Sequence, residues 1–79
     1  NRYSLEERLT QVIQQAQYKQ NIAALFIIDL DRFKNINDLL GYNVGDGLLV
    51  QVAERLKETV NEKDTVARIG GDEFVILIN

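Results

Sequence analysis

The sequence contains neither cysteine nor histidine, and these two absences exclude several kinds of site. Without cysteine the chain can form no disulfide and no thiolate zinc site. Without histidine it cannot carry out Ser-His or Cys-His catalysis, and a transition-metal centre is disfavoured. The lack of cysteine is also compatible with a cytoplasmic location.

Long apolar runs are missing as well. The longest one, over residues 23–28, is far too short to span a bilayer. We therefore expect a cytoplasmic protein, or the cytoplasmic part of a membrane-anchored one. Because the chain opens at Asn1 without a methionine and stops just after an apolar run, we also expect a piece of a longer protein.

The functional groups that remain are mostly oxygens and cations. The 79 residues include 12 Asp or Glu and 9 Lys or Arg, which gives a net charge of -3. Carboxylates suit a hard cation such as Mg²⁺. The mixed signs argue against a nucleic-acid-binding surface, so we expect no nucleic-acid partner. With 46% hydrophobic and 27% charged residues, the composition fits one small globular domain.

Hydrophobic periodicity predicts a helix over residues 5–18. Ser4 and Glu7 have the spacing of a capping box, in which each side chain satisfies an amide at the start of the helix. A strand is predicted over residues 23–28. Its nearly continuous apolar character is typical of a strand buried on both faces.

A second, short helix is predicted over residues 33–40 and would end at Gly41. A loop over residues 42–46 then leads into a third helix, and two short strands over residues 65–69 and 74–78 are joined by a glycine-rich turn. The apolar stripe of the third helix comprises Leu48, Leu49, Val52, Ala53, Leu56 and Val60.

These elements predict an α+β fold with a ferredoxin-like, palm-type sheet and helices on one or both of its faces. Residues 4–20 would form an N-terminal connector helix, and residues 22–79 a β-α-α-β-β core. In the split arrangement of such folds, the last strand lies between the other two. The end of the first strand and the hairpin turn then meet at one edge of the sheet.

Four carboxylates would converge at that edge, those of Asp29, Asp31, Asp72 and Glu73. Crowded carboxylates repel one another, and each raises the pKa of its neighbours unless a positive charge intervenes. A bound divalent cation relieves this repulsion. The pattern therefore predicts a metal site.

Groups suited to a nucleotide lie next to this cluster. Lys34 near the start of the second helix can reach a phosphate, and the backbone amides of residues 31–33 form an anion-binding helix start. The glycine-rich segment 41–47 offers contacts to a flat polar ring. Metal, phosphate and base contacts together describe a nucleoside triphosphate site.

Three blocks of the sequence resemble the GGDEF domain of diguanylate cyclases. Residues 68–74, Arg-Ile-Gly-Gly-Asp-Glu-Phe, contain the family's signature. Residues 29–38 resemble its second block and residues 45–46 its third, with matching spacing and no insertion. Three blocks in register make a very specific signal. The resemblance covers nearly the whole chain, which corresponds to about the first half of the domain.

The resemblance implies a site for Mg²⁺ or Mn²⁺, formed by Asp29, Asp72 and the main-chain carbonyl of Leu30. Glu73 would help to deprotonate the attacking 3′-hydroxyl, so Glu73, Asp72 and Asp29 are the expected catalytic residues. The residues that the resemblance implies in substrate binding are Asp31, Phe33, Lys34, Asn37, Asp46, Gly70 and Gly71.

Within this set the implied roles differ. Asn37 and Asp46 would hydrogen-bond the guanine edge, whereas Lys34 and the main chain of residues 31–33 would hold the phosphates. The glycine pair at positions 70–71 would let the hairpin backbone approach the nucleotide closely, because a Cβ would intrude there.

The activity implied is condensation of two GTP molecules into cyclic di-GMP and pyrophosphate. Each domain would hold one GTP, so a second GGDEF domain is an implied partner in a homodimer. An upstream sensor or a neighbouring phosphodiesterase domain is expected in a bacterial signalling protein, with the connector helix carrying the input. The 79-residue chain by itself is expected to be inactive.

Two positions depart from the family pattern. The inhibitory product site of many members is an Arg-x-x-Asp motif, but here Asn61 stands at the arginine position before Asp64. An amide cannot clamp a base or a phosphate as a guanidinium does. We therefore predict a degenerate inhibitory site with weak or absent product inhibition. The second departure is Tyr42, where histidine is common, and it carries no firm consequence.

Several of these side chains also have simpler interpretations. Asp31 is equally explained as a charge at a helix start, and Lys34 as a solvated surface lysine. Asp46 would then cap the third helix, and Asp64 would be a turn residue.

The rival function is a degenerate GGDEF module that binds GTP without turnover and regulates a neighbouring domain. The intact Asp29, Asp72 and Glu73 argue against it. A purely structural dimerisation element leaves the carboxylates and glycines unexplained.

Overall fold

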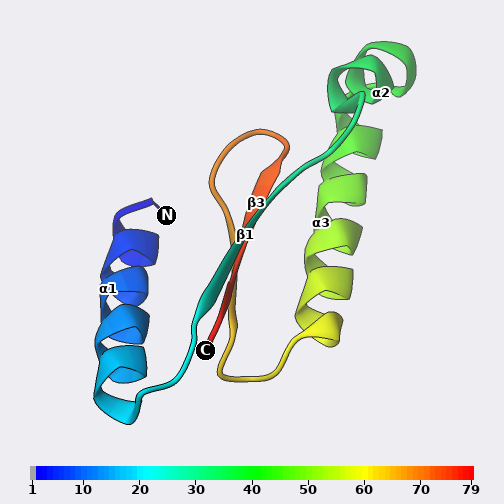
Figure 1. Ribbon diagram of the computed structural model, residues 1–79. Helices are drawn as coiled ribbons and strands as arrows, with labels where there is room; N and C mark the ends of the chain where they lie inside the picture. The colour runs from blue at the N-terminus through cyan, green and yellow to red at the C-terminus, as the bar shows by residue number, and fades with distance from the viewer. Residues whose placement is uncertain (1) are drawn as a thin grey trace.

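The computed structural model describes residues 2–79, and these form three helices and three strands (Figure 1). The elements in chain order are α1 (Arg2–Lys19), β1 (Ala24–Asp29), α2 (Phe33–Leu40), α3 (Tyr42–Thr59), β2 (Thr65–Arg68) and β3 (Glu73–Ile78). The predicted α+β fold class is therefore confirmed. None of the helices described is long and apolar enough to cross a bilayer.

The three strands form one sheet in the order β1-β3-β2. β3 is antiparallel to both neighbours, so β1 and β2 run parallel to each other on either side of it. The helices α2 and α3 form the crossover between these parallel strands. This is the predicted split arrangement, in which the last strand occupies the middle of the sheet.

Helices cover both faces of the sheet, with α1 on one side and α3 on the other (Figure 1). On the α3 side, Phe74 packs with Leu49 and Phe33 in the hydrophobic core. On the α1 side, the Arg8 guanidinium donates from Nε to Thr65 Oγ1 at 3.4 Å. Val12 of α1 is almost fully buried. The sheet is thus the middle layer of three.

The burial predicted for the first strand is found instead in the last one. Phe74 to Leu77 of β3 are all buried, whereas Leu25, Phe26 and Ile27 of β1 are 49–64% exposed. In residues 2–79, β1 is an edge strand because it pairs only with β3. The prediction that it is buried on both faces is therefore wrong for this structure. The radius of gyration of 14.6 Å reflects the same openness, since a compact domain of this length would have roughly 12 Å.

The predicted capping box at the first helix is also not where the helix begins. α1 already includes Arg2, so Ser4 lies inside the helix and is not its N-cap. Burial is confined to one narrow stripe of α1, and Ile13 is 45% exposed although it belongs to the apolar pattern that predicted this helix.

The loop predicted over residues 42–46 is helical, because α3 begins at Tyr42. Gly41 makes the whole turn between α2 and α3 with a φ of 91°, which favours glycine. Its N–H donates to Asn37 O at 2.9 Å, and its carbonyl accepts from Gly45 N at 3.2 Å. α2 therefore ends at Gly41 as predicted, but α3 starts directly after it. Asp46 lies within α3 and is not its N-cap.

Candidate functional site

The end of β1 and the start of β3 lie side by side, as the topology predicted. Asp29 is directly opposite Glu73 in the antiparallel register. One residue further along, Leu30 N donates to Asp72 O at 3.0 Å. This pairing and this hydrogen bond bring acidic residues from two distant segments of the chain to one edge of the sheet.

The Asp29 carboxylate lies in an unfavourable electrostatic environment. Its pKa is raised, first by the loss of hydration at the strand end and then by the charge of Asp72. A side-chain hydrogen bond with Asp72 and the charges of Glu73 and Asp31 act in the same direction. A hydrogen bond between two carboxyl groups requires a shared proton. The pair therefore favours a positive species between its oxygens.

The residues present fit a magnesium ion better than a metal that needs a full protein cage. Among residues 2–79, no three acidic side chains form a group able to hold one ion. The Asp29–Asp72 pair offers two carboxylates, and the carbonyl of Leu30 is the predicted third oxygen. Mg²⁺ is commonly bound by one or two carboxylates while it keeps several waters and substrate phosphates. A cation here would offset the neighbouring negative charges that raise the pKa of Asp29.

The chain turns sharply between β1 and α2. Arg32, the N-cap of α2, has a φ of 58° and a ψ of 25°, a left-handed conformation that is uncommon outside glycine. Within the described residues, its side chain makes no capping hydrogen bond to the helix. The first amides of a helix have no partner inside the helix. Phe33 is buried in the core, so only its main chain is available to a ligand.

Asn37 and Asp46 come from the two helices that Gly41 joins. Asn37 Oδ1 is buried and has no hydrogen-bond partner among the described residues. This oxygen lies against Gly45. A Cβ added to Gly45 would clash with it and would be 2.9 Å from Asn37 Cγ and 3.3 Å from Phe33 Cζ. A buried oxygen without a donor costs about 1–3 kcal/mol. Packing alone therefore does not account for this side chain.

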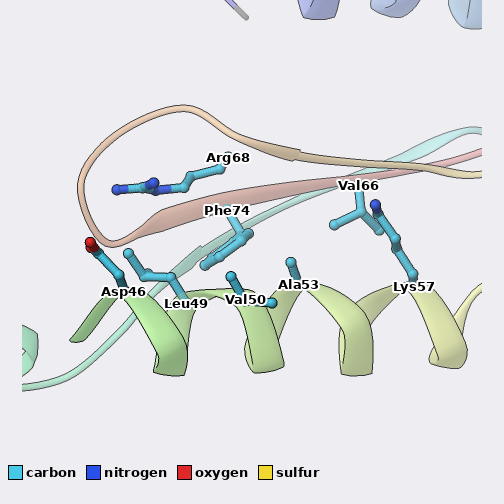
Figure 2. Close-up of a pocket in the computed structure, with 8 residues that line it drawn as sticks. All are labelled: Asp46, Leu49, Val50, Ala53, Lys57, Val66, Arg68 and Phe74. Atoms are coloured by element: carbon cyan, nitrogen blue, oxygen red, sulfur yellow. The ribbon is translucent and has the colours of Figure 1, made fainter. Parts of the chain in front are cut away.

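Asp46 lines a groove of about 460 Å³ between α3 and the hairpin (Figure 2). Its carboxylate points from the start of α3 toward the hairpin turn. The other residues that line this groove are Leu49, Val50, Ala53, Lys57, Val66, Arg68 and Phe74. Of the residues predicted to bind guanine, Asn37 thus packs against Gly45, and Asp46 faces the hairpin.

The hairpin turn is held by a side chain whose role the sequence analysis did not identify. Arg68 donates from Nε to Gly70 O at 2.9 Å and from Nη2 to Gly71 O at 2.8 Å. Ile69 N donates to Glu73 O at 3.0 Å and closes the turn. The only signal in the sequence was an arginine two residues before a glycine pair.

The two glycines of the turn have different surroundings. A Cβ on Gly70 would lie 3.1 Å from Glu73 Oε1, so the absence of a side chain there leaves room for the carboxylate. A Cβ on Gly71 would meet nothing within 4 Å. A side chain at position 70 would therefore require the Glu73 carboxylate to shift by a few tenths of an ångström.

A model of the family described as "Diguanylate cyclase, GGDEF domain" matches residues 1–79. The chain belongs to the GGDEF family. The bifunctional diguanylate cyclase/cyclic di-GMP phosphodiesterase MucR of Pseudomonas aeruginosa is 51% identical over 78 residues, which are 99% of this chain and 11% of MucR. The cyclic di-GMP phosphodiesterase NbdA of the same organism is 40% identical over 77 residues, 98% of this chain and 10% of NbdA.

The solved GGDEF domain of TpbB from Pseudomonas aeruginosa has the same fold, with a TM-score of 0.95 and 45% identity. The match covers 99% of this chain and 45% of that one. The GGDEF chain described here thus spans less than half of a solved GGDEF domain, and an even smaller share of the curated relatives.

The predicted degenerate inhibitory site, Asn61 and Asp64, lies in a turn that is closed by internal hydrogen bonds. Asp64 Oδ2 accepts from Asn61 N at 2.9 Å, and Oδ1 accepts from Asn79 N at 3.0 Å. These two backbone donors lower the pKa of Asp64. Both carboxylate oxygens are thus engaged within the chain, in agreement with the simpler interpretation of Asp64 as a turn residue. Tyr42, the other departure, is the exposed first residue of α3.

Proposed function

We propose that this chain forms the metal- and GTP-binding part of a diguanylate cyclase, which condenses two GTP molecules into cyclic di-GMP and pyrophosphate. The observation that carries the proposal is the meeting of Asp29 with Asp72 and Glu73 at one strand end, where Asp29 is opposite Glu73 and Leu30 N donates to Asp72 O. Family membership supports it. A purely structural sheet edge would gain nothing from keeping like charges together.

Asp29, Asp72 and the Leu30 carbonyl would hold Mg²⁺ or Mn²⁺. The metal would lower the pKa of the attacking hydroxyl and offset charge on the phosphorus oxygens. The uncapped amides at the start of α2, in the main chain from Asp31 to Phe33, lie directly after this strand and would receive the triphosphate. Lys34, exposed on α2, would add a positive charge for the same group.

Asn37 and Asp46 would recognise the base. The buried Asn37 Oδ1 has no donor among residues 2–79, and guanine carries N–H groups that can supply one. Asp46 would accept from the same edge of the base. The Gly70–Gly71 turn would let the hairpin backbone lie close to the nucleotide.

Glu73 would act as the proton acceptor for the 3′-hydroxyl. The 3′-oxygen of one GTP would form a bond to the α-phosphorus of the other, and the bond from that phosphorus to the pyrophosphate oxygen would break. The hydroxyl proton would go to the Glu73 carboxylate, and the first pyrophosphate would leave. The same attack by the other 3′-hydroxyl on the remaining α-phosphorus would close the ring and release the second pyrophosphate. Because each domain would hold one GTP, two such domains would face each other in a homodimer.

The test uses the full-length natural protein, since this chain spans less than half of the solved domain of TpbB. Cyclic di-GMP formation from GTP and Mg²⁺ would be measured for the wild type, for Glu73→Gln and for the control Glu58→Gln. Glu58 is exposed on α3 and lies outside the proposed site. We expect product from the wild type and the control, and none from Glu73→Gln. Equal product from all three proteins would remove Glu73 from the mechanism.

A second candidate is a module that binds GTP without turnover and regulates a neighbouring phosphodiesterase domain. The similarity to NbdA, which is named as a phosphodiesterase, favours it. Under this alternative, GTP with Mg²⁺ raises the Tm of the full-length protein but no cyclic di-GMP appears. Product formation that depends on Glu73 would exclude it.

A further inference from the structure

Arg68 is the one residue of the Arg-Ile-Gly-Gly-Asp-Glu-Phe segment that spans the hairpin turn with its own side chain. We propose that Arg68 is a positioning residue, which clamps the Gly70–Gly71 turn and thereby fixes where Asp72 and Glu73 stand. The proposal rests on the cyclase function proposed above. It assigns to Arg68 no contact with the nucleotide.

The clamp consists of two short hydrogen bonds to successive carbonyls. Nε lies 2.9 Å from Gly70 O, and Nη2 lies 2.8 Å from Gly71 O. A guanidinium holds its donors in a rigid planar fork, so two such bonds fix both the distance and the orientation of the turn. In Figure 2 the Arg68 side chain runs along the inside of the turn.

The two glycines that Arg68 contacts have the greatest backbone freedom in the turn. Glycine has more conformational freedom than any other residue, so a glycine pair makes a turn that has little preference of its own. Beyond the two glycines, the turn is tied to the sheet by Ile69 N bonded to Glu73 O and by Leu30 N bonded to Asp72 O. Arg68 supplies the restraint on the segment between these two anchors.

A displaced turn would act directly on the proposed chemistry. Asp72 follows Gly71 in the chain, and its carbonyl accepts from Leu30 N directly after Asp29. Gly70 lies close to the Glu73 carboxylate, since a Cβ built on Gly70 would be 3.1 Å from Glu73 Oε1. Misplacement of reacting groups by about 1 Å can cost on the order of 100-fold in rate.

Two substitutions distinguish a clamping role of Arg68 from the effect of its positive charge alone. Lysine keeps the charge but has a single ammonium on a flexible stem, which cannot reproduce a planar two-point fork. Arg68→Lys is therefore the informative substitution, and Arg68→Ala removes both properties. Arg55→Lys is the matched control, because Arg55 is exposed on α3 and lines neither this groove nor the turn.

The experiment measures kcat, KM for GTP and the Mg²⁺ concentration for half-maximal rate in the full-length protein. For both Arg68 variants we expect kcat to fall about 10- to 100-fold, a higher Mg²⁺ requirement and little change in KM. Free guanidinium should restore part of the rate of Arg68→Ala, because it can occupy the vacated fork. It should not restore Glu73→Gln.

Hydrogen exchange gives a readout that needs no turnover. Amides of residues 70–73 should exchange faster in Arg68→Lys than in the wild type and in Arg55→Lys, while amides of α1 stay unchanged and show that the protein is folded. Unchanged exchange in the turn would overturn the clamp even if the wild type made no product. Full activity of Arg68→Lys would also overturn it, and a rise in KM alone would assign Arg68 to substrate binding instead.

Discussion

The hairpin turn and the turn between α3 and β2 lie at opposite ends of β2. The pKa of an aspartate is shifted at each end, but in opposite directions. At the hairpin, Asp72 lies near Asp29, whose pKa is raised by lost hydration and by neighbouring carboxylates. At the other turn, two backbone amides donate to Asp64 and lower its pKa. Negative charges thus crowd together beside the hairpin, whereas the charge of Asp64 is stabilised by its two backbone donors.

Under the proposed function, this contrast separates an aspartate that takes part in the chemistry from one that stabilises the fold. A carboxylate that accepts two backbone N–H groups stabilises the fold in its charged form. Carboxylates that face each other at a strand end destabilise the fold unless a cation or a proton joins them. Perturbed carboxyl groups of this second kind are concentrated at functional sites.

The largest effect is expected from Asp72→Asn. Loss of one of the two proposed metal-ligating carboxylates should lower cyclic di-GMP formation by the full-length protein by about 100-fold or more. Mutation of residues that only support metal ligands already lowers metal affinity or activity by about 10- to 100-fold. The Tm of this variant at pH 7 without metal should stay the same or rise, because repulsion with Asp29 is relieved. A kinetic assay and a thermal melt of the same preparation check both parts.

The control for this prediction is Asp64→Asn, in the turn between α3 and β2. If Asp72→Asn lowered the Tm and left activity intact, the two aspartates would have the same role and the comparison would fail.

A smaller effect, on stability alone, is expected from Asp64→Asn. The folded-state pKa of Asp64 is lowered, so its ionised form stabilises the fold at pH values above the unfolded pKa, near 3.8. That contribution is lost as the pH falls through the lower, folded-state pKa. Thermal melts should therefore give a lower Tm for Asp64→Asn at pH 7, and the difference from the wild type should shrink in acid.

Asp64→Glu serves as the matched variant, since it keeps the charge but lengthens the side chain. A difference in Tm that grew toward acid pH would contradict the assigned sign.

The sequence allowed the meeting of Asp29 with Asp72 to be predicted, because strand order and a crossover rule fix which strand ends share an edge. It did not reveal the start of α3, since Gly45 and Gly47 are poor helix formers. Packing decides there: Asn37 fills the space that a side chain at position 45 would need. The close packing of α2 against α3 therefore outweighs the low helix propensity of glycine at this point.

Two other features were beyond sequence reasoning for different reasons. The apolar run of β1 indicates what the strand is able to bury, but its exposure depends on which partners cover it. The Arg68 bonds go to backbone carbonyls, which every residue possesses, so they leave no periodic pattern in the sequence. Hydrogen bonds of this kind are found only once the path of the turn is known.

The smallest effect is expected for feedback by the product. Asp64 already uses both oxygens on Asn61 N and Asn79 N, and Asn61 cannot supply the guanidinium that clamps a base or a phosphate. Adding cyclic di-GMP to the full-length enzyme should therefore change the initial rate little, and Asp64→Ala should not alter that response. Asn61→Arg tests the cause, because it restores the missing cation without touching the proposed active site. Submicromolar product binding that Asp64→Ala abolishes would mean that the carboxylate can leave its internal donors, and Asp64 would then join the ligand-binding class with Asp72.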